Sequence, residues 1–243
     1  MPQRSEDKME QATLKPAKEL AETYRKRPLP GESAAYTQAR TELLQAEIEA
    51  RRVITRLAEQ RQALPQGPLV QKDYRFRDAS GKEVGLIDLF GDHDTLITYF
   101  WMYGPERERP CPMCTNWLGG VNGNAADVKQ RAAFKILGRS PVARQQAFGA
   151  ERGWRDLDFV QTVGDDYARD HEGLDDEGYE YPIFAVYRRD GDKVCYFLVG
   201  EMPSEAADPG QDPRGAVDIA PLWNLLDMTP EGRGTDWYPK LSY

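Results

Sequence analysis

Two cysteines separated by two residues, Cys111-Pro-Met-Cys114, have the spacing at which protein thiols carry out redox chemistry. The spacer lets one thiol reach the other, so the pair can form a disulfide and reopen it by exchange through a mixed disulfide. The motif opens a segment of helical composition, and the free N–H groups and dipole of a helix N-terminus stabilise a thiolate. We therefore expect Cys111 to act as the attacking thiolate and Cys114 as the resolving thiol.

The same spacing also occurs in zinc sites and in pairs of inert, buried thiols. A structural zinc site needs four ligands, and the other candidates, Cys195, His93 and His171, lie apart with no second paired motif. We expect no metal and no cofactor. A buried cysteine can instead be a small hydrophobe. That interpretation stays open for the pair and is the preferred one for Cys195, which lies within an apolar strand.

The residues around the motif also predict the surroundings of the site. Trp101 and Tyr103 precede the cysteines and would flank the site as aromatic walls. Arg139 follows a later strand and, with the aromatic residues 99–103, would line a pocket for a small molecule. We expect all three to contact a substrate.

The segments before the cysteines predict a β-rich entry to the core. Residues 95–102 form a nearly continuous apolar, β-branched and aromatic run, which is typical of a central strand buried on both faces. Residues 74–77 and 83–87 predict a hairpin around the turn 78–81, and one helical turn is expected at 88–90.

The segments after the cysteines predict alternating helices and strands. We expect a helix from 115 to 133 that breaks near Gly119 and resumes at Asn124, because glycines interrupt it. The acidic block 156–180 carries ten acidic residues and one arginine, and predicts a solvated loop or a docking surface for a basic partner. The remaining predictions are a strand at 134–137, a helix at 141–153, a hairpin of strands 182–187 and 194–199 around Asp190-Gly191, a loop at 202–215 and a helix at 217–226.

The N-terminal part of the chain predicts an extension of the core. Residues 1–32 are polar and predict a flexible arm. Residues 33–65 predict a long amphipathic helix, and residues 66–243 are expected to form the main domain. Leu43, Ala50, Leu57 and Leu64 fall seven residues apart on that helix. We expect this apolar stripe either to pack on the main domain or to form the interface of a homodimer through residues 33–63.

Composition limits the classes of partner. The 243 residues suffice for one large domain with a helical extension, and 32 basic against 40 acidic residues argue against a nucleic-acid partner. No apolar run is long enough to cross a bilayer, and the first residues lack the apolar block of a secretory signal. Three cysteines are too few for a disulfide scaffold. We therefore expect a cytoplasmic protein that contacts no membrane.

The order of these elements around Cys111-Pro-Met-Cys114 resembles the thioredoxin superfamily. The resemblance implies a three-layer α/β fold with a central mixed sheet, to which this chain adds a long N-terminal helix. In such folds a cis-proline begins the strand beside the cysteines and presents backbone to the substrate, and Pro182 is the matching position. An ordinary strand-start proline is the alternative.

More closely, the chain resembles the bacterial thioredoxin-like family known as domain of unknown function 899, from about Ser33 onward. The resemblance implies the fold but brings no established reaction. This chain has Tyr99-Phe-Trp-Met-Tyr103 where relatives carry His-Phe-Met-Phe, and a specialised activity is therefore an alternative. The matching pieces are Ala39-Arg-Thr-Glu-Leu-Leu44, Arg61-Gln-Ala-Leu-Pro65, Asp73-Tyr-Arg-Phe76, Leu86-Ile-Asp-Leu-Phe90, Met102-Tyr-Gly-Pro105, Arg139-Ser-Pro141, Gly153-Trp154 and Leu226-Asp-Met-Thr-Pro-Glu-Gly-Arg233.

Three hypotheses about function follow. The leading one is a thiol–disulfide oxidoreductase acting on a protein or small-molecule thiol or disulfide. The peroxiredoxin motif Pro-x-x-x-Thr-x-x-Cys is absent, because Gly104 and Glu108 stand at its proline and threonine positions. The alternatives are a non-redox scaffold that binds a small molecule or performs a specialised biosynthetic reaction, and an interaction module that uses the long helix and the acidic block.

Overall fold

Strand β3 (Thr95–Phe100) lies at the centre of a seven-stranded mixed sheet. The sheet belongs to a computed structural model that describes residues 14–200, 221 and 239–242. β3 pairs in parallel with β4 (Ala133–Gly138) and antiparallel with β6 (Ile183–Asp190). Its neighbouring residues Tyr99 and Phe100, which point to opposite faces, are 3% and 0% exposed, as a strand covered on both faces requires. The prediction of a buried central strand is confirmed.

The sheet has the order β2-β1-β5-β4-β3-β6-β7. Strands β3, β4 and β5 run parallel, and the other neighbouring pairs are antiparallel. The predicted mixed α/β class is therefore confirmed. The remaining strands are β1 (Arg75–Arg77), β2 (Glu83–Gly85), β5 (Phe159–Thr162) and β7 (Lys193–Gly200).

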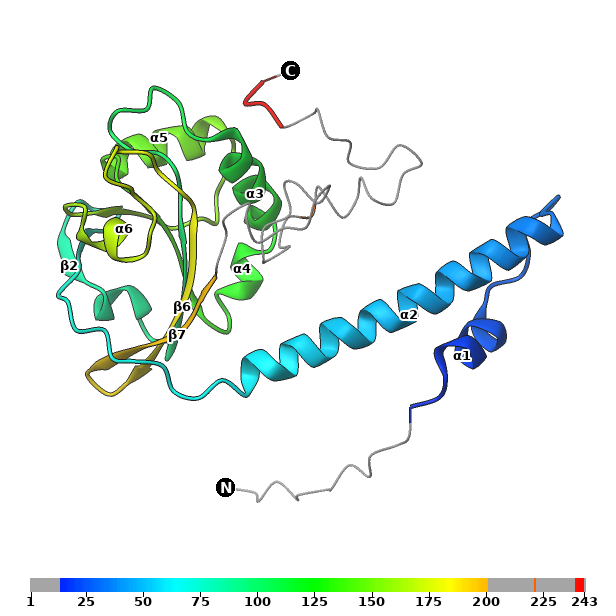
Figure 1. Cartoon of the computed structure of the whole chain (residues 1–243). Coiled ribbons are helices and arrows are strands. Elements are labelled where there is room, and N and C mark those ends of the chain that lie inside the picture. The colour runs from blue at the N-terminus through cyan, green and yellow to red at the C-terminus, as the bar shows by residue number, and fades with distance from the viewer. Residues whose placement is uncertain (1–13, 201–220, 222–238, 243) are drawn as a thin grey trace. The chain divides into compact units, whose positions relative to one another are not determined.

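Helices cover both faces of the sheet and make three layers (Figure 1). On one face, α3 (Pro112–Asn122), α4 (Ala125–Val128) and α5 (Val142–Glu151) pack over a core that includes Tyr99, Trp117 and Phe159. On the other face, the 3₁₀ turn Ile87–Phe90 and α6 (Asp166–Asp170) pack over a second core that includes Phe100 and Tyr187. Successive residues of β3 point to opposite faces, so the strand contributes to both cores.

The acidic block is wrongly predicted as a solvated loop, because it contains both β5 and α6. The short apolar run at Leu157, Phe159 and Val160 is buried, and it places β5 between β1 and β4. Several acidic residues of the block form ion pairs within the chain. Asp158, for example, forms ion pairs with Lys129 and Lys135.

Helix α6 has His171 as its C-cap, and the ring of this residue contacts a tyrosine cluster made of Tyr74, Tyr167, Tyr187 and Tyr196. His171 Nδ1 lies 2.7 Å from the carbonyl oxygen of Tyr167, and Nε2 lies 3.0 Å from the hydroxyl of Tyr187. A carbonyl only accepts, so Nδ1 carries a proton and donates to it. Burial lowers the pKa of His171 and so favours its neutral form, in which Nε2 accepts from the Tyr187 hydroxyl.

The helix after the cysteines ends later than predicted. α3 continues through Gly119 and Gly120 and ends at Asn122, with Gly123 as its C-cap, so the predicted break near Gly119 is wrong. A side chain at Gly119 would lie 3.8 Å from the Trp154 indole nitrogen, and one at Gly120 would lie 3.5 Å from Pro221. Both are ordinary van der Waals distances, so close packing does not require glycine at either position, and neither glycine ends the helix. The predicted continuation is a single turn, α4.

Both predicted hairpins are confirmed. β1 and β2 pair around a turn in which the Asp78 carboxylate accepts from the N–H groups of Ser80 and Lys82. β6 and β7 pair around Asp190-Gly191, where Gly191 adopts a φ of 62° that favours glycine. The predicted turn at 88–90, strand at 134–137 and helix at 141–153 also form. The predicted loop 202–215 and helix 217–226 lie outside the described residues, apart from Pro221.

The chain divides into two units, Met1–Pro65 and Gln66–Tyr243. In the first, α2 (Ala34–Gln62) is the predicted long helix, and the Ser33 hydroxyl caps it by accepting from the Tyr36 N–H. A second helix, α1 (Ala17–Tyr24), lies within the predicted arm, and Ala17 and Ala21 pack with Ile48 of α2. None of the described helices is long and apolar enough to cross a membrane.

In the second unit, residues 66–70 run along the outer edge of the sheet beside β7. The Val70 N–H donates to the Val194 carbonyl at 2.9 Å, and the Tyr196 N–H donates to the Pro68 carbonyl at 3.0 Å. Gly67 permits this approach, because a side chain there would collide with the Tyr196 carbonyl.

Candidate thiol site at the start of helix α3

Cys111 occupies the N-cap of α3, directly after the loop that leaves the central strand. Its N–H donates to the Met102 carbonyl at 3.1 Å, and its carbonyl accepts from the N–H and the hydroxyl of Thr115. Pro112 begins the helix, where its missing N–H costs no hydrogen bond. β3 and α3 together therefore fix the position of Cys111.

The environment of Cys111 favours its thiolate. The hydrogen bond from the Cys114 thiol is the largest cause that lowers the pKa of Cys111 to about 6, against the opposing effect of burial. The N–H groups of Cys114 and Met113 and the positive charge of Arg107 act in the same direction. At neutral pH the thiolate therefore predominates, and Cys111 is partly exposed to solvent.

Cys114 lies in the opposite environment, with 2% of its surface exposed. Its hydrogen bond to Cys111, burial and the negative charge on Cys111 together raise the pKa of Cys114, while the hydroxyl of Tyr99 partly opposes this. Both cysteines have free thiols in this structure, and the Cys114 thiol donates a hydrogen bond to Cys111. The pair thus combines a partly exposed cysteine that favours the thiolate with a buried cysteine that favours the protonated thiol, which is the distribution that an attacking and a resolving cysteine need.

Trp101 and Tyr103 lie in the core beside Cys114 and are almost completely buried. The two rings are 5.0 Å apart between centroids, and Trp101 also contacts Phe148 and Trp154. The Arg144 guanidinium covers the Tyr103 ring at 4.6 Å. In this arrangement both aromatic residues support the thiol site from within the protein.

Pro182 lies at the same end of the central strands as the cysteines. The register pairs Ile183 of β6 with Phe100 of β3, so Pro182 lies opposite Trp101. The next residue after Trp101 is Met102, whose carbonyl accepts a hydrogen bond from the Cys111 N–H. Pro182 is partly exposed. The structure therefore brings Pro182 close to the backbone that carries Cys111.

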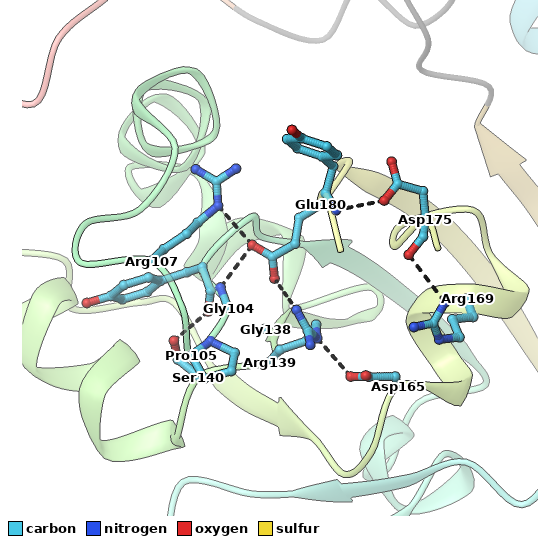
Figure 2. A network of polar contacts seen from close by, with 12 residues as sticks. Gly104, Pro105, Arg107, Gly138, Arg139, Ser140, Asp165, Arg169, Asp175 and Glu180 are labelled. Carbon is cyan, nitrogen blue, oxygen red and sulfur yellow. Dashed lines mark hydrogen bonds and ion pairs between the residues drawn. The ribbon is translucent and has the colours of Figure 1, made fainter. Parts of the chain in front are cut away.

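Arg139 belongs to a network of charges that includes a buried glutamate (Figure 2). Its guanidinium forms ion pairs with Asp165 at 2.9 Å and with Glu180 at 3.3 Å. Glu180 also accepts from the Gly104 N–H at 3.0 Å and from Arg107 Nε at 2.9 Å. Glu180 is a site residue that sequence reasoning missed within the acidic block. Its position two residues before Pro182 is the signal that could have singled it out.

A second arginine holds the loop 104–110 from the other side. Arg144 of α5 donates to the carbonyl oxygens of Pro105, Arg107 and Glu108. Arg109 instead pairs at the surface with Glu151 at 2.7 Å. The loop that leads to Cys111 is thus fixed through both its N–H and its carbonyl groups.

Other kinds of site receive little support from the part of the chain that the structure describes. There, no three His, Cys, Asp or Glu side chains are grouped as a metal site would require. A cavity of about 350 Å³ lies elsewhere, among residues that include Lys72, Tyr74 and Lys193. The cysteines and the aromatic residues 99–103 do not line it.

The central strand, the cysteine pair at the start of the next helix and the sheet order β5-β4-β3-β6-β7 define a thioredoxin-like protein. A family model described as "Bacterial protein of unknown function (DUF899)" matches residues 26–243. The chain belongs to this family.

The solved structures to which the chain is similar share little sequence with it. A hypothetical protein from Sinorhizobium meliloti 1021 has 16% identity and a TM-score of 0.40, covering 63% of this chain and 78% of its own. The mitochondrial 2-Cys peroxiredoxin from Plasmodium falciparum has 15% identity and a TM-score of 0.38, covering 55% and 79%. The exposed lipoprotein thioredoxin Etrx1 from Streptococcus pneumoniae strain TIGR4 has 14% identity and a TM-score of 0.37, covering 51% and 87%. A search of the curated proteins found no match.

Proposed function

We propose that the protein is a thiol–disulfide oxidoreductase that uses Cys111 and Cys114. The supporting observation is the partly exposed Cys111 at the N-cap of α3, whose pKa is lowered to about 6, above the buried thiol of Cys114. The substrate is a disulfide of a protein or a small molecule in a reducing compartment such as the cytoplasm. Pro182 would contact that substrate at the sheet edge, with Trp101, Tyr103 and Arg139 supporting the site.

In the proposed reaction the Cys111 thiolate attacks one sulfur of the substrate disulfide. A mixed disulfide forms, and the first substrate sulfur leaves as a thiolate that takes up a proton. Cys114 then loses its proton and attacks Cys111 Sγ, which breaks the mixed disulfide and releases the second substrate thiol. The substrate gains two electrons, and the two cysteines lose them as they form a disulfide.

The test is a redox titration of the full chain in glutathione buffers, with mass spectrometry to locate the bridge. We expect a reversible Cys111–Cys114 disulfide with a midpoint of roughly −320 to −220 mV, within the range of cytosolic glutathione. Cys114→Ser is expected to trap a mixed disulfide on Cys111 after treatment with a model disulfide, and Cys111→Ser is expected to trap none.

The matched control is Cys195→Ser, since Cys195 is also buried but lies on β7. It is expected to leave both the midpoint and the trapping unchanged. Thiols at positions 111 and 114 that stay reduced and unreactive in the folded protein would exclude the proposed function.

We also propose that the chain forms a homodimer through α2. The apolar row of this helix consists of exposed side chains: Leu43 and Val53 are each 52%, Ile54 is 65% and Leu57 is 40% exposed. Exposed apolar rows of this kind are typical of helix–helix interfaces.

A further inference from the structure

Glu180 places a buried negative charge beside the C-terminal ends of β3 and β4. Its side chain is 3% exposed, and the carboxylate receives hydrogen bonds from the Gly104 N–H, Arg107 and Arg139 (Figure 2). A carboxylate removed from water is stable only where charges and donors replace its hydration. Glu180 therefore ties the loop after β3 and the turn after β4 to the segment that precedes β6.

Arg107 connects this carboxylate with the thiol site. It lies on the loop four residues before Cys111, and its Nε donates to Glu180 at 2.9 Å. Its positive charge is one of the causes that lower the pKa of Cys111. The Arg107 carbonyl is held by Arg144, so both its backbone and its side chain are fixed.

The ion pair matters because a loop arginine otherwise samples many side-chain conformations. Holding one of them costs conformational entropy, which a bond to a buried carboxylate offsets. A guanidinium that moved into solvent would interact less with Cys111, since water screens charges strongly.

We propose that Glu180 is a positioning residue that holds Arg107 where its charge stabilises the Cys111 thiolate. The inference rests on the proposed thiol chemistry of Cys111 and extends it, because Glu180 acts through Arg107. A purely structural Glu180 would alter the stability of the fold and leave the acidity of Cys111 unchanged.

The test is the pH profile of Cys111 alkylation by iodoacetamide in the reduced full chain, with peptide mass spectrometry to read out position 111. We expect Arg107→Gln to raise the pH midpoint by about half a unit to one unit, because an opposite charge is lost. Glu180→Gln is expected to raise it as well. Loss of the Glu180 charge alone would lower the midpoint, so a rise identifies displacement of Arg107.

The double variant Arg107→Gln/Glu180→Gln separates the two effects. If Glu180 acts through Arg107, the double variant shows no larger rise than Arg107→Gln alone. Additive rises, or a midpoint that stays or falls in Glu180→Gln, would overturn the proposal. Glu180→Asp is measured alongside, because it keeps the buried charge and so protects the fold while its carboxylate is too short to hold Arg107. We expect a rise there too, and an unchanged midpoint would count against the proposal.

Two matched controls make the same chemical change elsewhere. Glu151→Gln removes the partner of Arg109 on the same loop, and Asp165→Asn removes the other partner of Arg139. Neither carboxylate contacts Arg107, and we expect both variants to keep the wild-type midpoint. A shift in Asp165→Asn as large as in Glu180→Gln would overturn the role of Arg107.

The same profile separates this inference from the proposed function. A wild-type midpoint near 8.5, the ordinary value for a thiol, would remove the basis of the proposed thiol chemistry. A wild-type midpoint near 6 that none of the Arg107 and Glu180 variants shifts would overturn the role of Glu180 alone.

Discussion

Gly104 lies where a side chain would collide with a buried carboxylate. A Cβ at this position would meet the Glu180 carboxylate and would lie 3.0 Å from Arg139 Nη1. The absence of a side chain therefore allows the Glu180 carboxylate to accept the Gly104 N–H. At the scale of single residues, this glycine determines whether the charge network can close.

Gly104→Ala is expected to destabilise the protein by about 1–3 kcal/mol, because it displaces a buried charge from its partners. The measurement is the urea midpoint followed by circular dichroism. Gly123→Ala is the control, since Gly123 ends α3 with a φ of −64° and nothing lies within 4 Å of a Cβ there. It is expected to leave stability unchanged or to raise it slightly. Equal effects of the two substitutions would contradict the role assigned to Gly104.

Residue types and spacing predict the cysteines of the site but not the charges around them. A motif of four consecutive residues identifies Cys111 and Cys114 as a candidate redox pair, because the chemistry of such a pair depends on short-range spacing. Glu180 lies 76 residues from Gly104 in the sequence, and its burial depends on how β3, β4 and β6 assemble. An acidic residue among nine others predicts solvent exposure, so only the folded sheet identifies Glu180 as buried.

Helix α6 shows how a short element can make the fold sensitive to pH. Burial lowers the pKa of His171, while its hydrogen bond to the Tyr167 carbonyl and the charge of Asp170 partly oppose this. The unfolded chain therefore binds a proton more readily than the folded chain below the ordinary value of about 6.5. Stability that depends on neutral His171 is lost as the pH falls from about 6.5 towards the lowered pKa.

We expect the urea midpoint of the wild type to fall between pH 7.5 and pH 5.5 by more than that of His171→Gln. The glutamine cannot take up a proton, so its variant lacks this contribution to the pH dependence. His93→Gln is the control, because His93 lies outside the tyrosine cluster. Identical pH dependence of the wild type and His171→Gln would contradict the prediction.

At the scale of elements, periodicity predicts the long and strongly patterned segments. β3, both hairpins and α2 follow from continuous apolar runs, turn residues or a helical repeat. β5 was missed because its four residues lie among acidic neighbours, and its place in the sheet depends on pairing with β1 and β4. α1 was missed because it is only eight residues long and is stabilised by packing on α2.

At the scale of the whole molecule, the apolar row on α2 predicts self-association. We expect sedimentation equilibrium to give twice the chain mass of 27.6 kDa for the wild type. The double variant Val53→Lys/Leu57→Lys is expected to shift the equilibrium to the monomer, because it places two charges in the apolar row. Thr55→Lys, about half a helical turn away, is the control and is expected to remain dimeric. A monomeric wild type would exclude the dimer.

The segment 66–70 has a consequence for any shortened version of the protein. It satisfies the Val194 carbonyl and the Tyr196 N–H on the outer strand of the sheet. An outer strand without such a cover is a template on which other chains add strands, and this leads to insoluble assemblies. A fragment of residues 66–243 is therefore expected to stay clear in solution, whereas one of residues 71–243 is expected to become turbid on concentration. The five residues after Pro65 thus protect the outer strand from aggregation, and a truncated protein that retains them keeps this protection.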